Sequence, residues 1–418
     1  MRLKPETEKR ARRWAEQRWI VDNLIAVQRA AMGAAAPVST SPRRYSLPAA
    51  IEGEIDLQTV SLRVEKFDDI PREYARIARQ REELARRAEE AGHLVTARDN
   101  YAAAACFYGN AGWAIFEAGN EELHAYYAKK NACYDKVIAS APIPIERVEI
   151  PFGNASLPAL LYLPSAPGQG GSPERFPCVV SINGMDSFKE ILHPIYGDKF
   201  LTRGMAVLAF DGPGQGECLV RRLFAQPDSF TRAGRACFDY LLTRPEIDPA
   251  RIAAKGMSYG SLWVLHFAAA EPRYVAASGT LGCLEPGGST IFEEASPTFK
   301  QRFMFMANID DEAEFDDFAT TLTWEGYADK VRCPTLMILG GADELSPVQY
   351  AYDLYDTLTC PKTLIVYEGA RHGITGPQTA NTPNHRAMEA DWLRDRFDGR
   401  PLTSSRILID LQGREHAH

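Results

Sequence analysis

A serine flanked by glycines, Gly256-Met257-Ser258-Tyr259-Gly260, is the feature that most constrains how this chain can fold. An apolar segment before it, residues 251–255, predicts a short strand, and the segment after it, residues 261–270, predicts a helix. Glycines on either side let a strand and a helix approach closely enough for a sharp turn, which exposes the serine hydroxyl. A glycine-rich turn whose serine only caps the helix would look the same. The motif therefore needs support from the rest of the chain.

Two later strands end in side chains that a serine nucleophile needs. Residues 334–339 are followed by Gly341-Ala342-Asp343-Glu344, and residues 363–368 are followed by Gly369-Ala370-Arg371-His372-Gly373. The carboxyl ends of parallel strands form the edge where ligands bind. Serine needs a base within hydrogen-bond reach, and an imidazole needs a carboxylate to fix its tautomer.

We therefore predict Ser258 as the nucleophile, His372 as the base and Asp343 as the carboxylate. Glu344 is the alternative carboxylate, but it lies one residue beyond the end of the strand. The order serine, acid, histidine is the one found in α/β-hydrolases. Five of the seven other histidines fall on helical patterns, at the start of a C-terminal helix, or in the C-terminal tail: His193 and His266, His385, and His416 and His418.

Two backbone N–H groups are expected to bind the negative oxygen that forms during acyl transfer. One belongs to Tyr259, the residue after the nucleophile, and the other comes from the loop after an earlier strand. Residues 178–182 predict that strand, so the N–H of Met185 is the second candidate. Asp186 follows directly, and it could either act as an additional acid in the site or cap the helix that begins near Phe188.

Five motifs together resemble one group of α/β-hydrolases. They are Asn183-Gly184-Met185-Asp186-Ser187-Phe188-Lys189-Glu190, Asp211-Gly212-Pro213-Gly214-Gln215-Gly216-Glu217, the glycine-flanked Ser258, Gly341-Ala342-Asp343 and Arg371-His372-Gly373. The chain is similar, from about residue 70 onward, to the family that includes 2,6-dihydroxypseudooxynicotine hydrolase and the fungal pigment hydrolases that shorten polyketide chains. The resemblance implies a Ser-Asp-His triad, an N-terminal helical region and an acid in the site at Asp186. Relatives with the longer glutamate at that position differ from this chain.

The chain of 418 residues exceeds what one hydrophobic core usually supports, so more than one domain is expected. Residues 1–145 predict an N-terminal helical lid domain, with Pro71 in a first helical turn, a helix over 93–118 and a third from Asn120. Residues 146–400 predict an α/β-hydrolase domain with a mostly parallel central sheet and helices on both faces. Its strands are expected near 145–150, 159–163, 178–182, 205–210, 252–257, 276–281, 334–339 and 363–368.

The remaining segments are interpreted from their composition. Residues 284–325 interrupt the alternation of strands and helices and predict an insertion that contributes to the lid over Ser258. Residues 33–48 and 168–173 predict loops. Residues 401–418 form a C-terminal tail in which 407–411 could be an added strand or a dimer contact.

Composition narrows the class of protein. A net charge of −8 argues against nucleic acid or an anionic membrane as a partner, and no apolar stretch approaches the length of a membrane span. The eight cysteines are scattered without paired spacing, which indicates reduced, buried thiols in a cytoplasmic protein and predicts neither a disulfide framework nor a metal cluster.

The motifs predict a serine hydrolase that needs no cofactor or metal and acts on a small molecule. A homodimer is the assembly we expect. Hydrolysis of a carboxylic ester makes the fewest chemical demands, whereas Asp186 makes cleavage of a carbon–carbon bond in a 1,3-diketone plausible. Acyl transfer, or a binding role without catalysis, are the other interpretations. Aromatic side chains such as Tyr108 and Trp113 predict either core packing or contact with a flat or bulky substrate.

Overall fold

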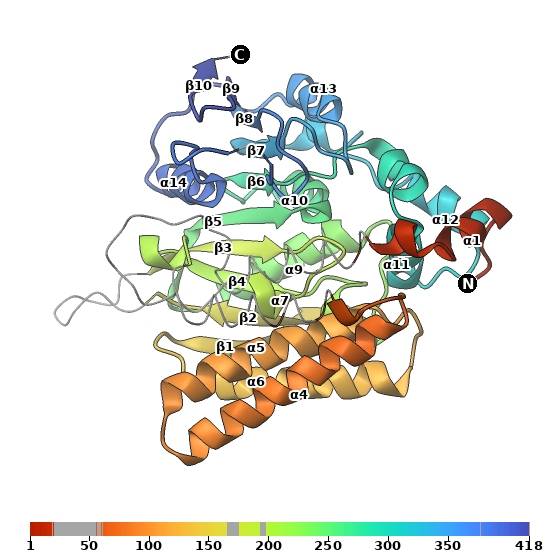
Figure 1. Ribbon diagram of the computed structural model, residues 1–418. Coiled ribbons are helices and arrows are strands. Elements are labelled where there is room, and N and C mark those ends of the chain that lie inside the picture. The colour runs from red at the N-terminus through yellow and green to blue at the C-terminus, as the bar shows by residue number, and fades with distance from the viewer. Residues whose placement is uncertain are drawn as a thin grey trace.

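The computed structural model describes residues 1–18, 20, 56, 60, 62–164, 175–192, 198–376 and 378–417. The loops predicted at residues 33–48 and 168–173, together with His193 and His418, lie outside the described residues. A sheet forms the centre of the molecule, three long helices lie along its β1 edge, and a smaller group of helices lies to one side (Figure 1).

The sheet has ten strands within the described ranges, in the order β1-β2-β4-β3-β5-β6-β7-β8-β9-β10. Strands β3 to β9 pair in parallel, and the pairings of β1, β2 and β10 are antiparallel. The strands are β1 (Ile145–Phe152), β2 (Ala155–Tyr162), β3 (Phe176–Ile182), β4 (Ala206–Phe210), β5 (Ile247–Met257), β6 (Ala277–Thr280), β7 (Thr335–Gly340), β8 (Lys362–Tyr367), β9 (Ser405–Ile409) and β10 (Glu415–Ala417).

The mostly parallel sheet predicted from the apolar runs is confirmed. Every residue of β4 and of β7 is buried, as expected where helices cover both faces of a parallel sheet. Strand β5 begins at Ile247, five residues before the predicted start at 252, because Ile247 pairs with Phe176 across an irregularity in the β3–β5 register. The polar stretch before the predicted strand therefore belongs to β5 as well.

Helices lie on both faces of the sheet. Helices α9 (Ser229–Leu242) and α10 (Tyr259–Ala270) pack against each other and against β5. Successive side chains of a strand point to opposite faces. The Cα–Cβ direction of Gly256 faces α10, whereas the neighbouring Lys255 reaches Glu389 of α14 (His385–Phe397) at 3.6 Å. Helix α14 therefore covers the face opposite α10.

Within the described residues, three long helices come directly before the sheet, as predicted for the N-terminal region. They are α4 (Asp69–Glu90), α5 (Leu94–Trp113) and α6 (Glu121–Ala139), and they lie beside β1 and β2 in Figure 1. Helix α6 starts where predicted, with the side chain of Asn120 accepting from the N–H of Leu123 at 3.0 Å. Helix α5 ends at Trp113, five residues before the predicted end at 118. The apolar residues that extended the pattern, Ile115 and Phe116, pack from the following turn instead.

An insertion separates β6 from β7, as the sequence predicts. It contains η2 (Pro286–Gly288), η3 (Thr290–Glu294), α11 (Pro297–Ala307), α12 (Glu312–Ala319) and η4 (Ala328–Lys330). The N-terminal helix α1 (Pro5–Ala11) contacts α11, and Figure 1 shows it beside α11 and α12. The remaining short elements are α7 (Lys189–Leu192), η1 (Leu201–Arg203), α8 (Gly216–Val220) and α13 (Gln349–Thr357).

The C-terminal tail adds to the sheet. Strand β9 pairs in parallel with β8, with Ile407 opposite Ile365, so the first of the two interpretations of residues 407–411 is confirmed. All eight cysteines are buried and unpaired. Among the described helices, none has both the length and the apolar character that a membrane crossing requires.

Candidate active site

Ser258 stands where β5 ends and α10 begins, with φ 56° and ψ −124°. A side chain held at positive φ costs on the order of 1–3 kcal/mol, so the surrounding structure must enforce it. A Cβ on Gly256 would lie 1.9 Å from the carbonyl oxygen of Gly260, and one on Gly260 would lie 2.7 Å from the carbonyl oxygen of Ile182. The two glycines therefore allow the close approach of β5, α10 and the end of β3 that forces the turn.

The three predicted side chains form a continuous hydrogen-bonded relay. The Oγ of Ser258 lies 3.0 Å from Nε2 of His372, and Nδ1 of His372 lies 2.9 Å from Oδ2 of Asp343. Asp343 follows β7 and His372 follows β8, so adjacent parallel strands deliver both residues to the same edge as Ser258. The geometry is that of a nucleophile, its base and the group that orients the base.

The position of Asp343 resolves the choice between the two adjacent carboxylates. Its Oδ1 accepts from the backbone N–H groups of Leu345 at 2.9 Å and Ser346 at 3.1 Å, which leaves Oδ2 for the imidazole. Glu344 also contacts His372, but it accepts from the backbone N–H at 3.0 Å. Glu344 therefore supports the loop that carries His372, and Asp343 contacts the ring.

The charge of His372 is set by the carboxylates around it. Burial by itself lowers the pKa of His372, but the charge and hydrogen bond of Asp343, with smaller contributions from Asp186 and Glu344, outweigh burial and raise the pKa above its usual value. The neighbouring carboxylates therefore favour the protonated, positively charged form of the imidazole. Asp186, which is partly buried, thus acts electrostatically on the same imidazole.

The loop after β3 lies against the serine. A Cβ on Gly184 would lie 2.8 Å from Cβ and 3.1 Å from Oγ of Ser258, so only a glycine lets this turn approach so closely. Met185 follows and is buried. The loop therefore brings the peptide between Gly184 and Met185 beside the nucleophile, as the sequence predicts for an oxyanion donor.

The N-terminus of helix α7 is bonded by a side chain from the loop after β4. Helix α7 begins at Lys189, and the N–H of Lys189 donates to Oδ1 of Asp211 at 2.8 Å. The side chain that bonds the first turn of α7 thus comes from a loop far along the chain.

A thiol that sequence analysis did not single out lies next to the nucleophile. Sγ of Cys283, just beyond β6, is 3.5 Å from Oγ of Ser258. Burial raises the pKa of Cys283 well above its usual value, so the thiol stays protonated and is a poor competing nucleophile. Cys283 is not part of a recognisable motif, so its position next to Ser258 could not be predicted from the sequence.

Buried charged side chains connect the loop after β3 with the loop after β4. Nζ of Lys189 lies 3.1 Å from Asp211, 2.8 Å from Glu217 and 3.1 Å from Glu190. Lys130 of helix α6 pairs with Glu190 at 2.6 Å, and neither side chain is exposed. Burial would raise the pKa of Glu190, but Lys130 and Lys189 lower it to about 2. Two of the five motifs that carry the family resemblance contain four of these residues, which was the signal available in the sequence.

Arg302 of α11 joins three parts of the chain. Its Nη1 donates to the carbonyl of Trp113 at 3.0 Å, and its Nε lies 3.4 Å from the carbonyl of Met185. Its guanidinium also lies 5.3 Å from the centre of the Trp113 ring. Burial lowers the pKa of Arg302 to about 10, so it remains charged at neutral pH. The end of α5 is thereby linked through the insertion to the loop beside Ser258.

Tyr108 and Trp113, the two aromatic residues considered as substrate contacts, lie in different surroundings. Trp113 is linked through Arg302 to the loop beside the serine, as described above. Tyr108 packs among the N-terminal helices, where its hydroxyl donates to Glu82 at 2.6 Å and its ring stacks on Tyr126. These contacts support core packing for Tyr108 and give no support to substrate binding.

The other described histidines take no part in the relay. Nε2 of His266 lies 2.8 Å from the carbonyl of Thr323, and burial lowers the pKa of His266 to about 4. His385 is the first residue of α14, and burial lowers its pKa to about 3. His416 lies in β10, 2.8 Å from Asp410.

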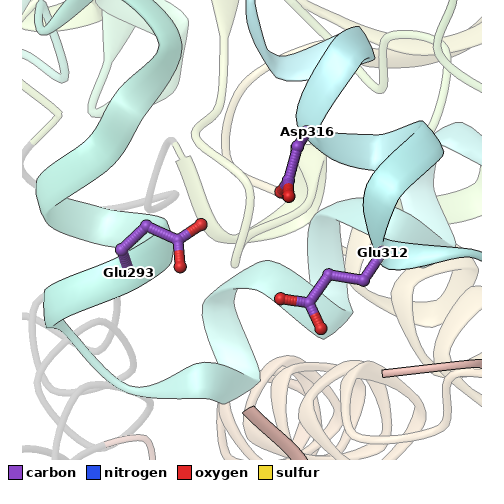
Figure 2. Close-up of side chains that lie close together, drawn as sticks. All are labelled: Glu293, Glu312 and Asp316. Atoms are coloured by element: carbon purple, nitrogen blue, oxygen red, sulfur yellow. The ribbon is translucent and has the colours of Figure 1, made fainter. Parts of the chain in front are cut away.

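Three carboxylates in the insertion turn toward one another, those of Glu293, Glu312 and Asp316 (Figure 2). The Nζ of Lys300 lies among them, 2.9 Å from Glu312 and 2.8 Å from Asp316, and it also pairs with Glu293. Lys4 from the N-terminal segment pairs with Asp316 as well. Because the ammonium groups of Lys300 and Lys4 already pair with the three carboxylates, the cluster is an ion-pair network that joins the N-terminal segment to the insertion.

Two family patterns match the chain. The pattern described as prolyl oligopeptidase family matches residues 234–400, which include Ser258, Asp343 and His372. The pattern described as esterase FrsA-like matches residues 73–307, more than half of the chain. The chain belongs to the FrsA-like esterase family. This FrsA-like protein is therefore a hydrolase of the α/β-hydrolase type.

Curated relatives of this FrsA-like protein are hydrolases from bacteria and fungi. A 2,6-dihydropseudooxynicotine hydrolase of Paenarthrobacter nicotinovorans is 28% identical over 275 residues, covering 64% of this chain and 70% of the relative. A hydrolase of Pyricularia oryzae, ORFZ, is 31% identical over 227 residues, covering 52% of this chain and 53% of the relative. The match thus spans about half of the fungal relative's length. The resemblance deduced from the motifs is confirmed.

Solved structures show the same fold. The crystal structure of a 2,6-dihydroxy-pseudo-oxynicotine hydrolase matches with a TM-score of 0.70 at 24% identity, covering 84% of this chain and 95% of that one. A structure of AbyA5 matches with a TM-score of 0.61 at 20% identity, covering 85% and 94%. The α/β-hydrolase fold with an N-terminal helical region is therefore confirmed.

Proposed function

We propose that this FrsA-like protein is a serine hydrolase that cleaves a carboxylic ester through an acyl-enzyme. The observation that carries the proposal is the unbroken relay from Ser258 through His372 to Asp343, with contacts of 3.0 Å and 2.9 Å. A serine hydroxyl is a weak nucleophile by itself and becomes reactive when a base can remove its proton.

The first half of the reaction forms the acyl-enzyme. Ser258 attacks the carbonyl carbon while His372 takes the hydroxyl proton and Asp343 stabilises the resulting imidazolium. The carbonyl oxygen becomes negative and is bound by the N–H groups of Tyr259 and Met185. His372 then gives its proton to the departing alcohol, which breaks the carbon–oxygen bond.

The second half releases the acid. Water attacks the acyl carbon, His372 removes a proton from that water, and the same N–H groups bind the oxyanion. His372 returns the proton to the oxygen of Ser258, which regenerates the enzyme.

Aromatic side chains of the insertion pack against Tyr259, the residue after the serine, and they support an aromatic or bulky acyl group. The ring of Tyr259 lies 4.9 Å from that of Phe303 and 5.9 Å from that of Phe292, both in the insertion. An environment rich in aromatic rings favours apolar substrates. Esters of aromatic or branched acids are therefore the substrates we propose.

A second candidate function is hydrolysis of a carbon–carbon bond in a 1,3-diketone, and Asp186 is the observation that favours it. Its charge acts on both His372 and Cys283, so it lies within electrostatic reach of the nucleophile. Cleavage of such a bond leaves an enolate that must be protonated, and a carboxyl group beside the site could assist that proton transfer.

A fluorophosphonate probe tests the proposed nucleophile. We expect covalent labelling of the wild-type protein at Ser258, loss of labelling in Ser258→Ala, and retained labelling in Ser261→Ala, a control three residues further along. Peptide mapping by mass spectrometry identifies the modified residue. An unlabelled Ser258, or equal labelling of Ser258→Ala, would refute the proposal and favour a non-catalytic role.

A further inference from the structure

Gln215 connects the loop after β4 to the loop that lies against Ser258. Its side chain is 1% exposed. Its Nε2 donates to the carbonyl oxygens of Asn183 at 2.9 Å and Gly184 at 2.6 Å, and its Oε1 accepts from the N–H of Gly212 at 3.0 Å. All three bonds are to backbone groups, so the amide fixes the course of two chain segments.

The bond to Gly184 determines how one peptide group is oriented. The carbonyl oxygen of Gly184 and the N–H of Met185 belong to the same peptide, and the described chain contains no cis peptide bonds. In a trans peptide the C=O and N–H bonds point in opposite directions. When Gln215 holds the oxygen, it therefore also sets the direction of the Met185 N–H.

That peptide lies beside the nucleophile. A Cβ on Gly184 would lie 3.1 Å from Oγ of Ser258. A hydrogen bond accepted by the carbonyl also polarises the peptide, which makes its N–H a stronger donor. The amide of Gln215 thus orients the Met185 N–H and also makes it a stronger hydrogen-bond donor.

We propose that Gln215 is the positioning residue of the oxyanion hole, because its amide holds the Gly184–Met185 peptide so that the Met185 N–H meets the developing oxyanion. The inference rests on the proposed function, since it assumes that Ser258 is acylated. Gln215 itself touches no reacting atom.

The chemistry of the contacts explains why a glutamine stands here. The site requires one acceptor for Gly212 and donors for two carbonyls, and an amide supplies both kinds of atom. A glutamate carboxylate has no donor for Gly184, and an asparagine is one methylene shorter. The buried surroundings make an unmade bond costly.

The loop that carries Gln215 is itself held firmly. Asp211 accepts from the N–H of Lys189 at 2.8 Å and from the N–H of Glu217 at 2.9 Å. Gly216 has φ 44°, and a Cβ there would lie 2.3 Å from a carboxylate oxygen of Asp211. These contacts therefore fix the backbone position from which the Gln215 side chain extends.

The test compares Gln215→Met with wild type in the full chain. We measure kcat and KM for p-nitrophenyl butyrate and the inhibition constant of phenylboronic acid, whose tetrahedral serine adduct places an oxygen at the oxyanion position. We expect kcat to fall about 10- to 100-fold, since a catalytic group displaced by about 1 Å costs that order of rate. KM should change less than about threefold, and the boronate constant should rise in parallel with the loss of kcat.

Two further variants make the outcome decisive. Gln215→Asn retains an amide in the loop but is one methylene short, so it should show the same loss even if Gln215→Met folds poorly. Gln349→Met, on the exposed surface of α13, should match wild type.

A lower melting temperature with unchanged kcat and boronate affinity would reduce Gln215 to a structural role and overturn the inference. If wild type is neither labelled by fluorophosphonate nor inhibited by the boronate, the proposed function fails. If wild type is labelled and inhibited, and the Gln215 variants have the same kcat and the same boronate inhibition constant, only the inference about Gln215 fails.

Discussion

At the scale of single residues, the proposed reactivity of Ser258 depends on one imidazole whose charge is controlled by neighbouring carboxylates. Despite burial, Asp343, Asp186 and Glu344 raise the pKa of His372. A general base must be neutral to accept a proton. Activity should therefore be present above the pKa of His372 in the folded enzyme and be lost as the pH falls through it.

The Asp343→Asn variant tests this control. We expect kcat/KM to fall by about 10⁴-fold, the order seen when a triad carboxylate is removed in other enzymes, because the imidazole loses its orienting partner. The acid limb of the remaining activity should move to lower pH, since the largest pKa-raising charge is gone. The measurement is the pH profile of kcat/KM for an aryl ester.

Asp353→Asn, an exposed aspartate on α13, is the matched control and should keep the wild-type profile. An acid limb at the wild-type pH in Asp343→Asn would show that Asp343 does not set the charge of His372.

The Asp186→Asn variant distinguishes ester hydrolysis from cleavage of a 1,3-diketone. In Asp186→Asn we expect cleavage of an aryl 1,3-diketone to slow by about 10²-fold or more, the usual contribution of a general acid, and ester cleavage to change much less. An ester needs only the proton that His372 carries. Parallel rates for both substrates in the variant, measured by product absorbance, would remove Asp186 from the chemistry.

At the scale of elements, buried ion pairs connect the loop after β3 with the loop after β4. The loops after β3 and β4 meet at Lys189, and helix α6 is joined to them by the Lys130–Glu190 pair. A buried ion pair adds little stability over apolar packing, but removal of one partner leaves an uncompensated charge.

The Glu190→Gln variant should therefore be strongly destabilised. Breaking a buried pair costs about 3–5 kcal/mol of unfolding free energy. Adding Lys130→Met should recover part of that loss, because the unpaired ammonium is then absent. Urea midpoints measure both effects.

Glu90→Gln removes a partner of Arg86 from an exposed pair within α4 and should leave the midpoint unchanged. A midpoint for Glu190→Gln equal to that of this control would contradict a structural role for the buried pair.

At the scale of the whole molecule, the N-terminal helices and the hydrolase sheet share polar interactions that neither could satisfy alone. Lys130 of α6 reaches Glu190 of α7, and Arg302 of the insertion donates to the carbonyl of Trp113 in α5. The helical region predicted as a lid is thus tied to the loop beside Ser258.

Removal of residues 1–144 should consequently yield an unstable and inactive protein, because Glu190 and Arg302 lose partners that burial makes necessary. Removal of residues 1–11 alone should be tolerated better, since α1 contains no buried residue. Circular dichroism melting and ester turnover compare the two truncations. Wild-type melting and kinetics in the longer truncation would show that the hydrolase domain is independent of the helices.

The sequence by itself predicted most of the strands, the sharp turn at Ser258 and the three residues that the structure brings together there, because local patterns encode them. Apolar runs fix the strands, glycines fix the sharp turn, and residues that follow parallel strands must meet at one edge. The choice of Asp343 over Glu344 also followed from its position at the end of a strand.

Only the tertiary structure decided which distant groups contact one another. The roles of Gln215, Cys283 and Arg302, and the choice of core packing over substrate contact for Tyr108, depend on side chains that approach from loops and helices far apart in the chain. The early end of α5 has the same origin, because Ile115 and Phe116 are apolar for tertiary packing and not for a helical face. Local periodicity reports that a residue is buried, whereas its partner is fixed only when the whole chain packs.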